Sequence, residues 1–309
     1  MFVLLNPTAG GGRALARWKR VAAGLKSRFG ALEVHDSADP RVTQTRIAES
    51  LACGERRFVA AGGDGTVNRL ISTLATLARP QLLPQISIGA VGLGSSNDFH
   101  KPFRNDAARG GIPDRLDFDA AAPHDVGVLL YADPQGTARR RYWINNASIG
   151  VTADGNYRFN APDLALRCLK RLATGPAICY AALRALVAHR PRLMTLQWDE
   201  EPPVPVPVSN LGVVKNPHFA GSLRYDSPRE PASGRFYVHL LEGQSVPRLL
   251  SALLGLSRGH FVRPGSRSWR AARLAVGARD PFPVEVDGEV VLARCACFAL
   301  LPCRLRICP

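Results

Sequence analysis

The sequence predicts an α/β domain built on a parallel sheet, followed by a mainly antiparallel β domain. In the first part of the chain, short apolar strands alternate with segments of helical periodicity, and glycine-rich loops follow three of the strands. After about residue 120, short strand-like runs separated by turn residues replace this alternation. At 309 residues the chain is also longer than most single domains. We therefore place two domains over residues 1–120 and 121–309, with the C-terminal end free to pack back on the first domain.

The chain opens with an apolar run, 1–6 (MFVLLN), which predicts a strand and leads into the loop 6–12 (NPTAGGG). A helix is predicted next, because apolar residues recur at helical spacing from Leu15 to Leu25. A glycine loop after the first strand of an α/β sheet commonly binds phosphate or ribose. This loop matches neither GxxxxGK[ST] nor GxGxxG, so alone it is weak evidence for a nucleotide site.

The strongest site signal is the stretch 57–70 (RFVAAGGDGTVNRL). It predicts a buried strand over 58–61, a glycine turn, and a helix that begins near Thr66. The glycines allow successive backbone N–H groups to point at one anion, and the helix N-terminus favours a phosphate there. Because Asp64 would repel a bare phosphate, its presence indicates a divalent cation that accompanies a nucleotide. A tight turn between a strand and a helix is the alternative for the glycines alone.

Two more strands are predicted over 32–35 and 86–91, with a helix over 42–53 between the first of them and the GGDGT strand. The last strand runs into the loop 92–99 (GLGSSNDF). Right-handed crossovers return successive strands in the same direction, so four strand–helix units would place their loops at one edge of the sheet. We expect one crevice there, lined by the first glycine loop, Ser37, the GGDGT loop, Ser95, Asn97 and Asp98.

The second part of the chain predicts an antiparallel sandwich, because short strands follow one another with turns between them. Two apolar helical segments, 163–189 and 247–257, interrupt it, and we expect them to pack on the sheet rather than face a membrane. The predicted strands are 125–130, 142–149, 193–198, 204–214, 234–242, 273–276, 284–286, 290–293 and 297–307.

Composition excludes some classes of protein and leaves a strong basic charge to explain. No run of about 18 apolar residues is present, and the apolar N-terminal segment is too short for a signal peptide, so we expect a cytoplasmic protein. The seven cysteines form no CxxC pair and are expected to be reduced. The net charge is +15, of which +10 lies after residue 120. Such a charge attracts nucleic acid, anionic membranes or polyphosphates, although an arginine-rich composition without any partner is an equal alternative.

The motifs together resemble the diacylglycerol kinase catalytic family, especially its bacterial lipid kinases. NPTAGGG, GGDGTVNRL, GLGSSNDF and VDGEVV follow one another in the order and approximate spacing of that family, and Asn145 to Gly150 (NNASIG) resembles another of its segments. The resemblance covers essentially the whole chain. It implies a nucleotide domain related to NAD kinase and phosphofructokinase, a β-sandwich domain that holds a lipid, and the cofactors ATP and Mg²⁺.

The resemblance also implies roles for individual residues. Asp64 and Asp98 would be catalytic, and both would bind Mg²⁺ together with Asp125, partly through water. Glu289, in Asp287-Gly288-Glu289, would be the general base, although Asp-Gly is also an ordinary hairpin turn. The ATP contacts would be Asn6, Pro7, Thr8, Gly10, Gly11, Gly12, Ser37, Gly62, Gly63, Asp64, Gly65, Thr66, Asn68, Ser95 and Asn97.

Three positions depart from the family pattern. Ser95-Ser96 replaces a threonine–glycine pair, and Arg69 stands where an acid is common. Ser233 replaces an aspartate that, in bacterial members, helps to bind a second, structural metal. We therefore do not expect that second metal site in this chain.

The function implied is phosphorylation of a hydroxyl of diacylglycerol or a related lipid, in lipid metabolism and phospholipid biosynthesis. The sequence does not identify the lipid or the oligomeric state. Peripheral contact with an anionic membrane is expected, and nucleic-acid binding is not, because no interleaved basic and aromatic strand motif is present. The alternatives are a soluble kinase of the same superfamily, such as an NAD kinase, and a non-catalytic basic protein that binds membranes or nucleic acid.

Overall fold

The computed structural model describes residues 1–309 except 104–107, 110, 161–165, 167–168, 170–173 and 262–263. The chain divides into two compact units. The first unit comprises residues 1–126, 218–222 and 301–309, and the second comprises residues 127–217 and 223–300.

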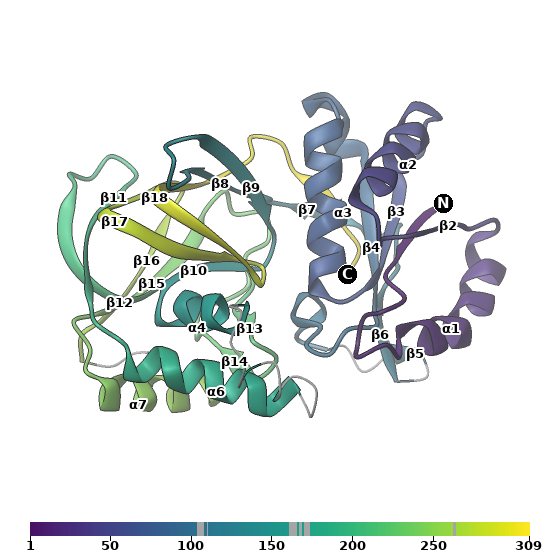
Figure 1. The fold of residues 1–309 in the computed structure, drawn as a ribbon. Coiled ribbons are helices and arrows are strands. Elements are labelled where there is room, and N and C mark those ends of the chain that lie inside the picture. The colour runs from purple at the N-terminus through teal and green to yellow at the C-terminus, as the bar shows by residue number, and fades with distance from the viewer. Residues whose placement is uncertain (104–107, 110, 161–165, 167–168, 170–173, 262–263) are drawn as a thin grey trace. The chain divides into compact units, whose positions relative to one another are not determined.

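The first unit is built on a sheet whose strands β2, β1, β3 and β4 are parallel and adjacent in that order (Figure 1). Near β4 the sheet continues with β19, which is parallel to β4, and with the antiparallel strands β6 and β7. The predicted parallel α/β architecture is confirmed. The strands of this sheet are β1 (Phe2–Leu5), β2 (Glu33–Asp36), β3 (Arg57–Gly62), β4 (Ser87–Gly92), β5 (Ala108–Arg109), β6 (Ile112–Arg115), β7 (Ala122–His124) and β19 (Leu305–Ile307). The unit also contains β13 (His218–Phe219), which lies outside this sheet.

Helices cover both faces of this sheet, which explains why β1 and β4 are apolar on both sides. Helix α1 (Ala14–Phe29) buries Trp18, Val21 and Leu25 in a cluster that includes Val3 and Val59. Helix α2 (Pro40–Ala52) begins where the Asp39 carboxylate accepts the N–H of Arg41 at 2.8 Å. Helix α3 (Asp64–Leu77) packs against β3. The crossovers thereby bring the loops after β1, β3 and β4 to one edge.

The fourth strand–helix unit that we predicted is wrong in one respect. After β4 the chain forms only a short 3₁₀ turn at Asp98–His100. Asn97 adopts a left-handed conformation with φ of 49°, and its side chain binds the backbone of the preceding loop rather than capping a helix.

The second unit is a nine-stranded sheet in which all the described strand pairs are antiparallel, as predicted. The strand order is β16-β15-β12-β10-β17-β18-β8-β9, and β11 pairs with both β12 and β17. The elements are β8 (Gly127–Ala132), β9 (Ala138–Trp143), β10 (Asn146–Gly150), α4 (Val151–Asn160), α6 (Thr174–Val187), β11 (Arg192–Trp198), β12 (Val204–Val214), β14 (Leu223–Arg224), β15 (Phe236–Glu242), α7 (Val246–Ser257), β16 (Ser266–Ala271), β17 (Leu274–Val286) and β18 (Glu289–Leu300).

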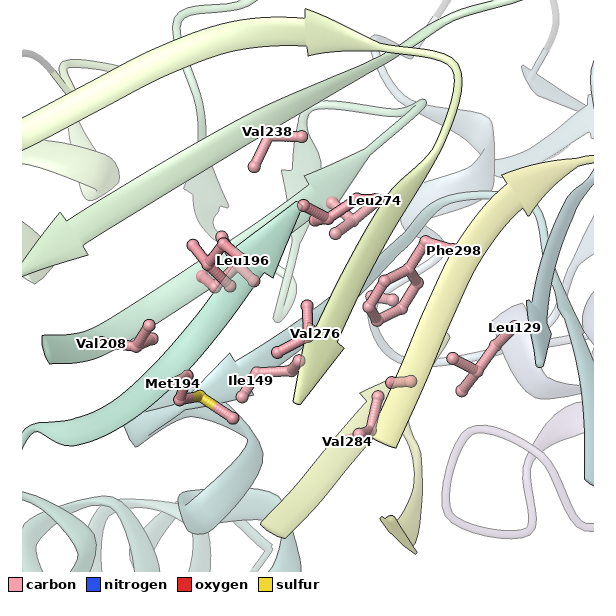
Figure 2. Packing of buried hydrophobic residues seen from close by; sticks show 14 of the residues in the cluster. Leu129, Ile149, Met194, Leu196, Val208, Val238, Leu274, Val276, Val284 and Phe298 are labelled. Atoms are coloured by element: carbon pink, nitrogen blue, oxygen red, sulfur yellow. The ribbon is translucent and has the colours of Figure 1, made fainter. Parts of the chain in front are cut away.

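Apolar side chains from these strands converge on one core (Figure 2). Leu196 on β11, Val276 on β17 and Phe298 on β18 all lie in it, which is why alternate residues of these strands are apolar. Long strands change partners around this core. The first half of β17 pairs with β11 and the second half with β10. On its other side β17 pairs with β18, with a register shift between Gly277 and Phe282.

Three predicted strand boundaries are wrong. The run 142–149 is two strands, β9 and β10, because Ile144 and Asn145 leave the ladder to bind the Asp287 carboxylate. The runs 273–276 and 284–286 are one strand, β17, because the strand continues through residues 277–281, which are exposed or partly exposed and lie between the two apolar runs. The runs 290–293 and 297–307 are also divided differently: β18 covers the first run and the start of the second, and β19, at the end of the second run, belongs to the other unit.

The helical segments are partly as predicted. Helix α7 lies where we expected it, whereas α4 was not predicted. Within the predicted segment 163–189, α6 is observed from residue 174, and residues 163–165, 167–168 and 170–173 lie outside the described part of the chain.

Candidate active site

Three glycine-containing loops meet at one edge of the first unit's sheet. A Cβ atom built on Gly94 would lie 2.5 Å from the Cα of Gly63, and one built on Gly10 would lie 2.5 Å from the carbonyl oxygen of Leu93. Both distances are shorter than real Cβ contacts. The loops after β1, β3 and β4 can therefore approach this closely only because glycine stands at these positions.

Two side chains hold the loop after β4 in this arrangement. The Arg17 guanidinium of α1 donates to the carbonyls of Leu93 and Gly92, each at 3.1 Å. The Asn97 amide accepts the N–H of Gly94 at 3.0 Å and donates to its carbonyl at 3.1 Å. Burial and neighbouring arginines lower the pKa of Arg17. Our sequence interpretation missed Arg17, since its helical position beside Trp18 does not distinguish it from other surface arginines of α1.

The loop after β1 is organised by Asn6, whose side-chain oxygen accepts the N–H of Thr8 at 3.1 Å and its hydroxyl at 2.9 Å. Gly10, Gly11 and Gly12 then follow with φ between 59° and 82°, a run that only glycine adopts readily. This loop therefore has its conformation set by the motif itself. Pro7, which was predicted to contact ATP, lies between Asn6 and Thr8 in the same turn.

Ser37, at the end of β2, is buried and donates its N–H to the carbonyl of Leu5 at 2.8 Å. The Arg69 guanidinium of α3 donates to the Ser37 carbonyl. Arg69, which departs from the family pattern, thus connects α3 to the loop after β2.

The GGDGT loop ends β3 and starts α3, whose first residue is Asp64. A Cβ on Gly62 would lie 2.2 Å from the buried Thr66 hydroxyl oxygen, so Gly62 is needed for this turn to close. The Gly63 carbonyl accepts the N–H of Thr66 at 2.9 Å, which begins the helix. Gly65 and Asn68 lie in the first turns of α3. The turn is thus a strand-to-helix connection, and it also presents the helix N-terminus at the loop cluster.

Two carboxylates of this cluster influence each other. Burial raises the pKa of Asp64, and the negative charge of Asp98 raises it further, whereas the N–H of Phe99, bound at 2.7 Å, opposes both effects. Asp98 accepts a bond from the Lys101 ammonium at 2.6 Å and the N–H of Gly221 at 3.1 Å. Lys101 also donates to the Gly221 carbonyl. A cation near Asp64 would relieve the repulsion between the two aspartates.

The predicted metal ligands fit Mg²⁺ unequally. Asp64 is suitable, since it is a carboxylate in an environment that a positive charge would stabilise. Asp98 already binds Lys101 and Gly221, and Asp125, only 2% exposed, binds the Arg304 guanidinium at 2.7 Å. No group of three or more His, Cys, Asp and Glu side chains able to hold a metal is found among the described residues. A magnesium ion here would therefore depend on Asp64 together with nucleotide phosphates and water.

The predicted general base lies in the second unit, on the hairpin between β17 and β18. Asp287 and Gly288 have φ of 46° and 92°, so Asp-Gly forms the two-residue turn that we had considered as the alternative. The side chain of Glu289 is 63% exposed, and the nearest guanidinium nitrogen of Arg141 lies 3.9 Å from its carboxylate. The exposed carboxylate is compatible with a base, and that role stays a prediction.

The carboxylates of Asp287 and Glu285 hold this turn in place through hydrogen bonds to backbone N–H groups. Asp287 accepts the N–H groups of Ile144, Asn145 and Asn146 at 2.8–3.0 Å, so the turn's first residue is an anchor. Glu285 is buried and accepts the N–H of Gly288 at 2.5 Å and the Ser148 hydroxyl at 2.8 Å. Burial raises the pKa of Glu285 to about 7; these two bonds lower it, and the charge of Asp287 raises it. Sequence reasoning missed Glu285, because one polar residue in an apolar strand carries no local signal of burial.

A hollow of about 720 Å³ lies elsewhere on the second unit, over strands β8, β9, β11, β17 and β18. The register places Ala275, Cys297 and Leu130 side by side, on adjacent strands. Small and apolar side chains form most of the lining, and Arg139 and Arg140 stand on the β9 side. Such a lining suits an apolar ligand with an anionic group.

Residues 1–126 match the family model described as the diacylglycerol kinase catalytic domain. This stretch contains all three converging loops, Asp64 and Asp98. The match covers the part of the chain that carries these motifs, and the resemblance that the motifs predicted is confirmed.

Curated relatives extend the similarity beyond this domain. The chain is 21% identical over 315 residues to "Putative lipid kinase YtlR" of Bacillus subtilis, covering 99% of this chain and 98% of that protein. It is 25% identical to "Probable lipid kinase YegS-like" of Stenotrophomonas maltophilia, covering 89% and 86%. A protein of the same name from Chromohalobacter salexigens is 32% identical but aligns over 53% of this chain and 47% of that protein.

Solved structures show the same fold. A crystal structure described as that of a diacylglycerol kinase from Bacillus anthracis superposes with a TM-score of 0.68 at 15% identity, covering 99% of this chain and 95% of that one. A second from the same organism, described as "a putative diacylglycerol kinase", has a TM-score of 0.73 at 15% identity and covers 99% and 96%. Among the described residues, no helix has both the length and the apolar character needed to cross a membrane.

We expect Glu285 to make stability depend on pH. Its folded pKa, about 7, lies above the value of about 4.3 in an unfolded chain, so the folded state binds more protons between these values. Glu285 thus opposes folding increasingly as pH rises from about 4.5 to about 7. Relative to Glu285→Gln, the wild-type protein should lose on the order of 1–3 kcal/mol of unfolding free energy between pH 5 and pH 8. Urea unfolding of both proteins at the two pH values measures this, and an unchanged difference would contradict it.

Proposed function

We propose that this protein is an ATP- and Mg²⁺-dependent kinase that phosphorylates a hydroxyl group of a lipid. The observation that carries the proposal is the convergence of the three glycine loops on the N-terminus of α3, beside Asp64. Three further findings support it: the diacylglycerol kinase domain match over 1–126, relatives named as lipid kinases, and fold neighbours described as diacylglycerol kinases. In this proposal the protein contributes to phospholipid biosynthesis.

The residues have separate tasks in the proposed reaction. The loop amides and the α3 N-terminus bind the phosphates, with Ser95 and the Asn6–Gly12 loop contacting the nucleotide. Magnesium, when bound, neutralises charge on the transferring phosphoryl group. Asp64 would hold the magnesium ion, and the Lys101 ammonium keeps the Asp98 carboxylate in place. Glu289 accepts the proton of the attacking hydroxyl.

A transfer assay with γ-labelled ATP tests the proposal and its alternatives. The acceptors are diacylglycerol, monoacylglycerol, a sphingoid base, ceramide, phosphatidylglycerol and NAD. Label in a lipid supports the proposal, and label in NAD alone would identify a soluble kinase of the superfamily. No transfer to any acceptor, by folded protein, would favour a non-catalytic binding protein.

Asp64→Asn should abolish most activity while leaving the fold intact. Asparagine keeps the oxygen that accepts the Phe99 N–H but removes the charge. We expect kcat to fall at least a hundredfold, about 2.7 kcal/mol of transition-state stabilisation. The control is Asp119→Asn on the surface of the same unit, which should keep normal turnover. Near-normal turnover of Asp64→Asn would reduce GGDGT to a structural turn.

Glu289→Gln should lower kcat by about 10²- to 10⁴-fold with little change in ATP affinity, because glutamine cannot take the hydroxyl proton. Glu201→Gln, exposed on a loop of the same unit, is the matched control. Steady-state kinetics with both substrates separates kcat from KM. If Glu289→Gln turns over like the control, Asp287-Gly288-Glu289 serves the hairpin alone and the base is another residue.

We also propose that the hollow over β8, β17 and β18 receives an acyl chain of the acceptor. Cys295 and Cys297 line it, whereas Cys53 is exposed in the first unit. Saturating acceptor lipid should therefore slow alkylation of Cys295 and Cys297 severalfold and leave Cys53 unchanged, as read from peptide masses. Equal labelling of all three cysteines with and without lipid would assign the chain to a different surface.

The acceptor resides in a bilayer, so we propose peripheral contact of a cytoplasmic protein with anionic membranes. The excess of positive charge after residue 120 supports this electrostatic contribution. Flotation with anionic and neutral liposomes tests it. Equal binding to both kinds of liposome would show that positive charge does not contribute to membrane binding.

A further inference from the structure

A lysine ammonium lies in a cradle of oxygen atoms in the second unit. Lys215 Nζ donates to the carbonyl oxygens of Glu230 at 2.6 Å and Arg235 at 2.8 Å, and lies 3.4 Å from the Ser233 hydroxyl. The Ser233 hydroxyl itself donates to the Arg235 carbonyl at 2.9 Å. Ser233 is the residue that replaces the metal-binding aspartate implied by the family resemblance.

The cradle suits an ammonium group. Lys215 directly follows β12, is only 3% exposed, and extends its charged end to two carbonyls and one hydroxyl. An ammonium has three donors, and burying it is tolerable only when these donors are satisfied. Each of these three oxygens can accept one of its N–H groups.

The same cradle does not suit a divalent metal. Mg²⁺ or Ca²⁺ binds oxygens at about 2.0–2.6 Å and prefers at least one carboxylate. A metal this close to the Glu230 and Arg235 carbonyls would compete with Nζ for the same space, and the two positive charges would repel each other. Position 233 supplies a hydroxyl where a carboxylate would be needed, so the residues do not fit the structural metal that the resemblance implies.

We propose that the Lys215 ammonium takes the place of a structural cation, tying the segment 230–235 to the end of β12, so that this chain has no second metal site. The backbone shows what this tie supports. The N–H groups of Lys215 and Asn216 donate to the Asn145 carbonyl at 2.9 and 2.8 Å, and the Asn145 N–H donates to Asp287 at 3.0 Å. Two successive hydrogen bonds thus connect Lys215, through Asn145, to Asp287 in the turn that precedes Glu289.

The first test removes the charge. Lys215→Met keeps a long side chain but leaves the Glu230 and Arg235 carbonyls without the ammonium, and Tm should fall by roughly 5 °C. Lys26→Met, on the exposed surface of α1, is the matched control and should leave Tm unchanged. A Tm of Lys215→Met equal to that of the control would overturn the proposal.

The second test converts the cradle into a metal site. In Lys215→Ala/Ser233→Asp, two carbonyls and a new carboxylate surround the space left by the ammonium. Its Tm should be low in EDTA and rise by several degrees with excess Ca²⁺ or Mg²⁺. The wild-type protein and Lys26→Met should show no such rise, all without nucleotide. A double variant that ignores both cations would contradict the idea that the ammonium replaces a metal.

The third measurement keeps a cation at position 215. EDTA-treated wild-type protein and Lys215→Arg are both titrated with Ca²⁺ in a calorimeter. The two proteins should give the same binding, because each keeps a cation at position 215. Ca²⁺ binding to the wild type that Asp64→Asn leaves intact but Ser233→Ala weakens would place a metal at this site and overturn the proposal. None of these readouts uses kinase activity, so the proposed function and this inference can fail independently.

Discussion

The close approach of Gly63 and Gly94 is the constraint on which the candidate nucleotide site depends. These glycines lie in the loops that follow the neighbouring parallel strands β3 and β4, and a side chain on Gly94 would collide with the Gly63 backbone. Gly10, in the loop after β1, meets the same loop at the Leu93 carbonyl. With the loops this close, Arg17 and Asn97 can bind the backbone after β4, and Asp64 stands beside Asp98 at the start of α3. The glycines thus determine where the charges of the site lie.

Lysine and arginine side chains bind several buried or partly buried oxygen atoms of the structure. Lys101 binds Asp98, Arg304 binds Asp125, and Lys215 binds the carbonyls of the segment 230–235. Each of these cations belongs to the chain, so its position does not depend on the concentration of an ion in solution. Asp64 differs, because burial and a neighbouring carboxylate raise its pKa. It is therefore the carboxylate at which we expect an external cation to matter most.

The sequence predicted what depends on local pattern. The four parallel strands, the glycine loops and α3 follow from apolar periodicity and glycine placement, and the Asp-Gly hairpin follows from turn chemistry. It did not predict the break between β9 and β10 or the roles of Glu285, Arg17 and Lys215. Each of these depends on bonds between a side chain and residues distant in sequence, such as Asp287 with Ile144. Periodicity within a short window carries no information about such bonds.

Binding of ATP by Gly94→Ala tests the central claim most directly, because one methyl group should force apart the loops that form the site. Calorimetric titration with ATP and Mg²⁺ should show at least tenfold weaker binding than wild type, about 1.4 kcal/mol. Gly24→Ala on α1, where a Cβ meets nothing within 4 Å, is the control and should bind like wild type. A folded Gly94→Ala protein that binds ATP as tightly as Gly24→Ala would contradict the claim that these converging loops are the nucleotide site.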